Sequence, residues 1–303
     1  MSFVPSHQGA VVRLVLAAAA WGLGTVVSKR AVDEIPPSTL LSIQLSVSLI
    51  VLAVLTRLRH IPWRSADTPS GLLRLGLLNP GLSYALSLIG LTSITASLSV
   101  LLWAFEPLMI LALAAVVLAE RVGARTLVLS VIAVSGLAVV IGQPGAGGPD
   151  MGFGIALTVA GVACCAVYTV VGRRWLGDVA ASVSTAPVVM GQQAYALAFA
   201  LGLVLVVALT GGDVLPTEVS LAGWASAVGS GTLYYGAAYW WYLAALRRLP
   251  ASTAAASFYL IPLFGVAGGI AILGERLTAA QWAGATVALA AVFLILRRAP
   301  VTP

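Results

Sequence analysis

Charged residues are scarce in this sequence of 303 residues. They make up 9% of the chain, against the roughly 25% found in soluble domains, whereas hydrophobic residues make up 60%. The mean hydropathy is +1.03. A chain with so few charges cannot cover its surface with groups that water solvates. The composition therefore excludes an ordinary soluble domain and predicts an integral membrane protein.

Histidine and cysteine are also nearly absent, with two residues of each. His7 and His60 lie outside the long apolar runs, so no serine within a run has a histidine base available from one. Cys164 and Cys165 are adjacent, which suits neither a metal site nor a disulfide framework and is typical of helix packing. No two acids within a run stand at metal-ligand spacing. These absences argue against a membrane-embedded enzyme and predict no cofactor or metal.

The net charge of +6 raises the question of nucleic acid as a partner. The Lys and Arg residues occur singly or in pairs between apolar runs, without a basic stripe or interleaved aromatic residues. Membrane topology explains this distribution, so nucleic-acid binding is excluded and the lipid bilayer is the expected environment.

The apolar runs predict ten transmembrane helices, since a span needs about 20 apolar residues. Their approximate bounds are 11–32, 39–57, 72–91, 94–119, 126–141, 151–171, 183–209, 221–246, 252–273 and 278–296. A Gly- and Pro-rich break follows the fifth run. We therefore predict an all-α membrane protein with a first five-helix repeat over 1–142, a linker over 143–150 and a second five-helix repeat over 151–303.

The positive charges give the predicted helices an orientation. If the spans alternate, all 16 Lys and Arg residues except Lys29, Arg30 and Arg276 fall on the side of the two termini. Positive charge gathers on the cytoplasmic side of membrane proteins, so both termini are predicted to be cytoplasmic. The first run resembles a signal peptide but is interpreted as an uncleaved helix, because nine further runs follow it.

Internal repetition supports the division into halves. Residues 76–121 align without gaps on residues 231–276, with matches at Gly76/Gly231, Gly81/Gly236, Tyr84/Tyr239, Ala96-Ser97/Ala251-Ser252, Pro107/Pro262 and Glu120-Arg121/Glu275-Arg276. Each half holds an odd number of spans, so the second copy is predicted to be inverted relative to the first. Inverted repeats are typical of secondary transporters, whose substrate site lies between the copies.

These motifs resemble a known family. Trp21-Gly22, Ala96-Ser97, Pro107, Ala119-Glu120-Arg121 and their second-half counterparts through Gly274-Glu275-Arg276-Leu277, Gln281 and Gly284 are similar to the EamA-type transporters of the drug/metabolite transporter superfamily. The closest resemblance is to bacterial exporters of aromatic and other amino acids and related metabolites. One departure is Gln44, where many relatives carry arginine.

The resemblance implies a multi-pass protein of the bacterial cytoplasmic membrane, with a central cavity lined by the third, fourth, eighth and ninth helices and alternating access. It implies a small-molecule substrate, an amino acid or related metabolite, with protons as a candidate coupling ion and a monomer or homodimer as the assembly. Exchange of sugar phosphates, nucleotide sugars or drug-like solutes is the alternative. Phosphorylated anions call for Lys or Arg in the cavity, and no predicted span interior contains one.

Glu106 is the only acidic residue near the middle of a predicted span. A charge there costs roughly 2.5–3.5 kcal/mol on insertion scales, so the side chain should face inward and be partnered or protonated. Two interpretations stay open: a proton-coupling or substrate-ammonium site, and a neutral carboxyl hydrogen-bonded within the bundle. The aligned residue of the second copy is Ile261, so the acid is specific to one half.

The other candidate substrate-binding residues lie on the third, fourth, eighth and ninth predicted helices. Spacing of four residues places Asn79, Ser83 and Ser87 on one helical face. The further candidates are Tyr84, Ser99, Trp103, Tyr235, Tyr239 and Phe258. Contact with substrate and contact with neighbouring helices remain alternatives for the polar residues, while the aromatic residues offer stacking surface and hydroxyl donors.

Pro107 and Pro262 are candidate hinges, because each removes a helix hydrogen bond at an aligned position. A static kink that shapes the cavity is the alternative. Trp21 is a candidate gate residue beside two glycines, with packing as its alternative role. Lys29 is expected to pair locally with the acids that follow it, and Glu275 is expected to form a loop ion pair at a helix end.

Overall fold

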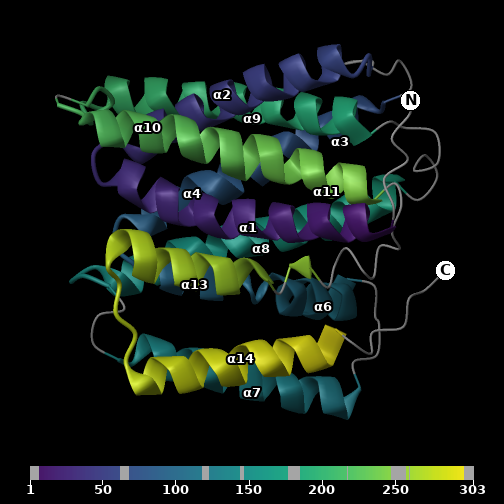
Figure 1. The fold of residues 1–303 in the computed structure, drawn as a ribbon, viewed down its shortest axis with the longest axis vertical. Helices are drawn as coiled ribbons and strands as arrows, with labels where there is room; N and C mark the ends of the chain where they lie inside the picture. Colours follow the sequence, from purple (N-terminus) through teal and green to yellow (C-terminus); the bar gives the residue numbers. More distant parts are fainter. Residues whose placement is uncertain are drawn as a thin grey trace.

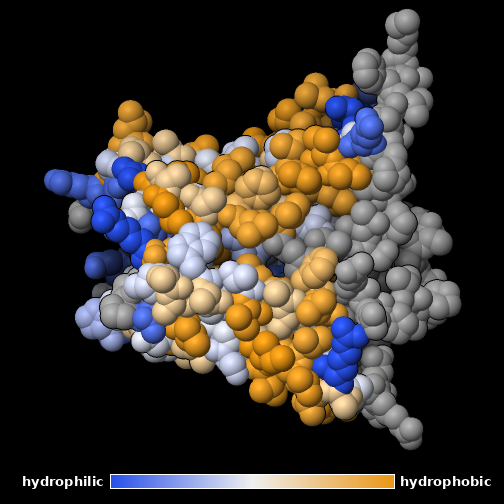
Figure 2. Space-filling view, turned by 60° about the horizontal axis from the view of Figure 1, so that its bottom comes forward, coloured by the Kyte–Doolittle hydropathy of each residue, from blue (hydrophilic) through white to orange (hydrophobic). Residues whose placement is uncertain are grey.

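The computed structural model of the chain describes residues 7–61, 68–117, 123–143, 147–176, 185–216, 218–246, 257–258 and 260–296. Nearly all of these residues are helical, and the helices run side by side along a common direction (Figure 1). The space-filling view shows apolar residues over the middle of the bundle and strongly hydrophilic residues towards its two ends (Figure 2). This pattern is the one expected of helices that cross a bilayer.

The first half forms five spans. They consist of α1 (His7–Val32), α2 (Pro37–Leu58), a third span made of α3 (Ser70–Arg74), η1 (Leu75–Leu77), η2 (Leu78–Leu82) and α4 (Ser83–Leu91), a fourth made of α5 (Ala96–Trp103) and α6 (Glu106–Val117), and α7 (Ala124–Ile141).

The second half forms five more. They are α8 (Met151–Leu176), α9 (Thr185–Leu209), an eighth span made of α10 (Leu221–Ser230), η3 (Gly231–Ala237) and α11 (Ala238–Leu246), a ninth that contains α13 (Leu260–Leu273), and α14 (Ala279–Leu296). Seven helical segments of the described ranges are long and apolar enough to cross a membrane, and α13 and α14 are shorter apolar helices. The predicted all-α membrane fold of ten helices is confirmed.

Contacts between the connections show how the halves are oriented. The amide of Ser220 donates to Glu34, the amide of Ala96 donates to Glu275, and the amide of Gly148 donates to the carbonyl of Ser93. We call the end of the bundle that holds these connections the capped face. The described chain begins and ends at the opposite face (Figure 1). Because α1 runs toward the capped face and α8 runs away from it, the second half is inverted relative to the first.

The third and eighth spans are interrupted at aligned positions, by η2 and η3. A glycine admits a neighbouring helix next to each interruption: a Cβ on Gly231 would lie 2.7 Å from the carbonyl of Gln44, and a Cβ on Gly76 would overlap the backbone of Gln192. The third span predicted over 72–91 is found over Ser70–Leu91, but it is not one continuous α-helix. Asn79 has φ −143° and ψ 120°, so it does not share a helical face with Ser83.

Pro107 coincides with a break rather than a bend. α5 ends at Trp103 and α6 begins at Glu106, so Pro107 is the second residue of the new helix. Proline has no N–H for the carbonyl four residues earlier, but it fits the first turn of a helix. In the ninth span α13 begins at Leu260, two residues before Pro262. A hinge function of either proline stays a prediction.

Candidate substrate site

Aromatic side chains from both halves meet inside the bundle. We call this group the ring cluster; its members come from α1, α4, α5, η3, α11 and the segment before α13, and they are Trp21, Tyr84, Trp103, Tyr234, Tyr235, Tyr239, Tyr242 and Phe258. Ring centroids in contact lie 5.0–5.5 Å apart, mostly edge to face, as aromatic pairs prefer.

Tyr84 is the centre of one part of the cluster. Its ring lies 5.4 Å from that of Trp103, 5.3 Å from Tyr234 and 5.2 Å from Tyr235. Tyr84, on the third span, thereby contacts rings of both the fourth and the eighth spans. Tyr234 also packs against the buried cluster that contains Trp21, and so links the two parts.

Trp21 is the centre of the other part. Its ring lies 5.5 Å from each of Tyr239, Tyr242 and Phe258. The Trp21-Gly22 motif explains this position, because a Cβ on Gly22 would stand 2.5 Å from the carbonyl of Ile261. The absence of that Cβ lets α13 approach α1 and brings Phe258 to the indole.

The position of Tyr84 depends on close packing between α4 and α8. A Cβ on Gly90 would lie 2.5 Å from the carbonyl of Gly154, and one on Gly161 would lie 2.5 Å from the carbonyl of Ser83. The hydroxyl of Ser83 donates to the carbonyl of Gly161 at 2.8 Å. Small residues at such contacts let membrane helices approach backbone to backbone.

Glu106 lies beside the ring cluster as the first residue of α6. Its Oε1 accepts a hydrogen bond from the Cys165 thiol at 3.2 Å, and it is close enough to Tyr168, Tyr234 and Tyr242 to act on them electrostatically. The side chain is half-buried. The N-terminus of a helix favours negative charge, so the break before Pro107 gives the carboxyl a suitable position.

Among the described residues, one hydrogen bond reaches the Glu106 carboxyl, and it comes from the Cys165 thiol. An ionised carboxylate accepts at about four sites, and a thiol is a weak donor. The ion pair of the described ranges joins Lys29 to Asp33, far along the chain from Glu106. The carboxyl therefore has acceptor capacity that a ligand or a proton can use.

Three glutamines join the surrounding helices. Gln44 donates to Ser28 at 2.9 Å and to Ser230 at 2.7 Å. Gln192 accepts from the Tyr168 hydroxyl at 2.9 Å and donates to the carbonyl of Leu72, and Gln193 donates to the carbonyl of Tyr235 at 3.0 Å. These bonds hold both copies of the second span against the interrupted spans.

The structure brings most of the predicted site residues together. Glu106 lies next to the ring cluster, which contains Trp21, Tyr84, Trp103, Tyr235, Tyr239 and Phe258. Ser83 is fully buried between α4 and α8, Ser99 is 2% exposed within α5, and Asn79 is 5% exposed at the third-span break, where its Oδ1 has no hydrogen-bond partner. These three lie outside the cluster of rings.

Two members of the site are not among the residues that the sequence predicts. The sequence predicts a packing role for Cys165, yet its thiol contacts Glu106. Tyr234 belongs to the ring cluster, and the alignment of residues 76–121 with 231–276 pairs it with Asn79, at the break of the third span. That pairing was the available signal.

An inverted ten-helix bundle with an internal aromatic site defines a membrane transporter rather than an enzyme. The model of the EamA-like transporter family matches residues 8–142 and 152–297. The chain therefore belongs to the EamA-like transporter family.

Two further comparisons cover nearly the whole chain. An uncharacterized transporter of Archaeoglobus fulgidus is 25% identical over 288 residues, which span 94% of this chain and 98% of the relative. A solved crystal structure covers 96% of this chain and 98% of its own, with a TM-score of 0.65 and 19% identity. This likeness supports the fold.

Proposed function

We propose that this transporter exports amino acids and related small metabolites across a bacterial cytoplasmic membrane by alternating access. The substrate site is the ring cluster together with Glu106. The substrate's ammonium group binds Glu106, and its side chain lies against the rings of Tyr84, Trp103 and Tyr239.

The single hydrogen bond that the described residues give the Glu106 carboxyl is the observation that carries the proposal. A charged carboxyl among rings, with one thiol donor, is costly in a membrane unless a cation or a proton neutralises it. An ammonium group supplies the charge, and the faces of tyrosine and tryptophan rings attract the same cation. The same carboxyl can take up a proton when the site is empty, which provides coupling to a proton gradient.

The orientation follows from the charge distribution. Among the described residues, Arg57, Arg74 and Arg125 lie at helix ends opposite the capped face, and the alternation of spans predicted from the sequence assigns most of the other Lys and Arg residues to the same side, which we propose to be cytoplasmic. Substrate then enters from that face and leaves through the capped face, in the direction of export.

The experiment is transport by purified protein in liposomes. A panel of labelled aromatic and aliphatic amino acids is tested against sugar phosphates, with and without a pH gradient, and protein-free liposomes give the background. We expect saturable transport of amino acids that responds to the gradient. Transport of none of the amino acids would refute the substrate assignment, and transport of sugar phosphates alone would favour the anion-exchange alternative.

A further inference from the structure

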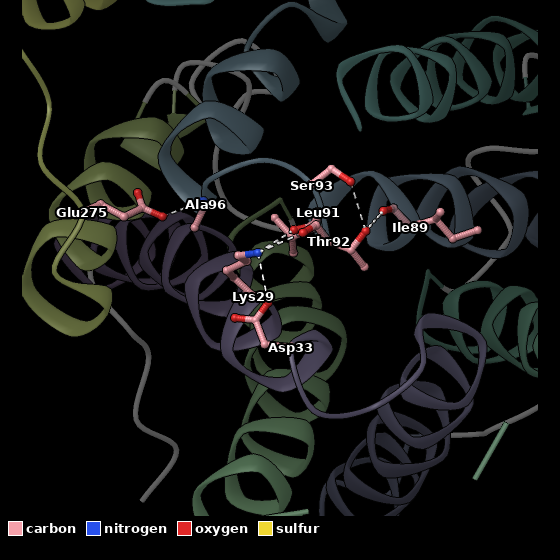
Figure 3. A network of polar contacts seen from close by, with 8 residues as sticks. All are labelled: Lys29, Asp33, Ile89, Leu91, Thr92, Ser93, Ala96 and Glu275. Atoms are coloured by element: carbon pink, nitrogen blue, oxygen red, sulfur yellow. Dashed lines mark hydrogen bonds and ion pairs between the residues drawn. The ribbon is translucent and has the colours of Figure 1, made fainter. Parts of the chain in front are cut away.

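The carboxylate of Glu275 caps the N-terminus of α5 at the capped face (Figure 3). Its Oε1 accepts from the amide of Ala96 at 2.7 Å, and its Oε2 accepts from the amide of Ser97 at 3.0 Å and from the Ser97 hydroxyl. The loop ion pair predicted for Glu275 is therefore wrong: its partners are the free N–H groups of a helix end, which favour a negative charge. We call this arrangement the Glu275 cap.

Two glycines make the Glu275 cap possible. Gly274 has φ +69°, a conformation that side chains disfavour, and it turns the chain back toward α5 after α13 ends. Gly269, one turn earlier on α13, lies against the carboxylate: a Cβ there would stand 2.5 Å from Glu275 Oε2 and 2.8 Å from Ser97 Oγ. The carboxylate occupies the space that a side chain at Gly269 would take.

A second contact holds the preceding helix end. Lys29, near the end of α1, donates to the carbonyl of Leu91 at 3.0 Å and to that of Thr92 at 3.4 Å, and it pairs with Asp33 at 3.0 Å (Figure 3). A cation thus lies at the C-terminus of α4 and an anion at the N-terminus of α5. Each charge matches the helix end that it contacts, so both ends of the short connection between the third and fourth spans are held.

The Glu275 cap borders a small cavity. Its lining comes from α5, α7 and the 275–281 segment and includes Glu275 itself, Ser97, Leu101, Val140 and Gln281. One turn below, a Cβ on Gly265 of α13 would lie 2.6 Å from Val100 of α5. A passage from the ring cluster to the capped face between these helices requires α5 and α13 to separate, and the cap joins them.

The two copies of the repeat differ at both glycines. The alignment that pairs Glu120 with Glu275 places Ala114 opposite Gly269 and Ala119 opposite Gly274. Glu120 and Ser252, the counterparts of Glu275 and Ser97, lie outside the described residues. Only the second copy therefore has glycines at the two positions that leave room for a capping carboxylate.

We propose that the Glu275 cap is the gate of the capped face, and that Gly269 makes closure of this face the preferred state of the transporter. The proposal rests on alternating access, but not on the identity of the substrate. During each cycle the carboxylate leaves Ala96 and Ser97 so that α5 and α13 part, and it rebinds them when the face closes.

The test is the accessibility of a reporter in the cavity that the Glu275 cap borders. Val140, 3% exposed, is replaced by cysteine in purified full-length protein whose two native cysteines are replaced by serine. Gly269→Ala places a methyl group where the flexible carboxylate end lies, so the variant loses the cap while the helix keeps its backbone contacts. We expect a polar maleimide to label the reporter at least about tenfold faster, since a charge-assisted hydrogen bond is worth about that factor.

Gly202→Ala is the matched control, because it adds the same methyl group to a membrane helix at a position with no atom within 4 Å. It is expected to leave the labelling rate unchanged. Glu275→Gln tests the carboxylate without adding volume and is expected to speed labelling as Gly269→Ala does. Labelling of both variants at the parent rate would overturn the proposal. Since the assay uses no substrate, it stays decisive if amino acids prove not to be transported.

Discussion

Replacing Glu106 by glutamine is the most direct perturbation of the proposed site. Glutamine has nearly the same shape and keeps an acceptor oxygen for the Cys165 thiol, which lies 3.2 Å from Oε1 in the native protein. The change removes the negative charge and the proton-binding group. We expect the variant to fold as well as the parent, because a charge that costs roughly 2.5–3.5 kcal/mol in the bilayer is gone.

The expected loss of binding follows from the contacts. A hydrogen bond between a carboxylate and an ammonium group is worth about 1.5–3 kcal/mol, whereas its neutral replacement is worth about 0.5–1.5 kcal/mol. The difference of about 1–1.5 kcal/mol lowers the affinity by roughly 5- to 13-fold at 1.36 kcal/mol per factor of ten. Because the ring cluster remains, exchange should stay measurable.

The assay combines equilibrium binding with transport in liposomes, with and without a pH gradient. Glu106→Gln should bind substrate more weakly and lose its response to the gradient. Asp213→Asn serves as the control, because it removes one carboxylate from an exposed position between α9 and α10. An unchanged affinity together with an unchanged gradient response would refute the reasoning and make Glu106 a structural residue.

Two further predictions concern the frame around the site. Gly161→Ala places a methyl group 2.5 Å from the carbonyl of Ser83 and should destabilise the protein in detergent by about 1–3 kcal/mol. Gly202→Ala is the control and should leave the stability unchanged, because no atom lies within 4 Å of its new methyl group. Equal unfolding midpoints for the two variants would contradict the α4–α8 contact. At the capped face, hydrogen bonds from the Ser220 amide and hydroxyl lower the pKa of Glu34. Their stabilisation is therefore present at neutral pH and is lost as the pH falls through that lowered pKa, so the stability difference between the parent and Glu34→Gln should disappear in acid, as melting curves over a pH series would show.

The aligned motifs show how far the sequence leads and where it stops. Pro107/Pro262 and the two Glu-Arg pairs predicted an inverted repeat, because identical residues in register report a shared local structure. They did not show the partner of Glu275. A carboxylate that caps a helix of another span depends on a contact between residues 179 positions apart, which no local pattern encodes.

The third span shows a similar limit. Periodicity placed Asn79 and Ser83 on one face, on the assumption of an unbroken helix. The helix breaks at Asn79, which precedes Pro80 and is therefore disfavoured in the helical conformation, and Gly76 nearby admits the backbone of Gln192 from α9.

The sequence by itself determined the class of protein, the number of spans and the inverted relation of the halves, because hydropathy and internal identity are properties of the chain. It also singled out Glu106 as the one acid near the middle of a predicted span. Only the tertiary structure decided the partner of that acid, since the Cys165 thiol of α8 reaches it through helix packing. Such packing depends on which glycines allow two helices to approach closely. This depends on the residues of both helices at the contact and not on either helix alone.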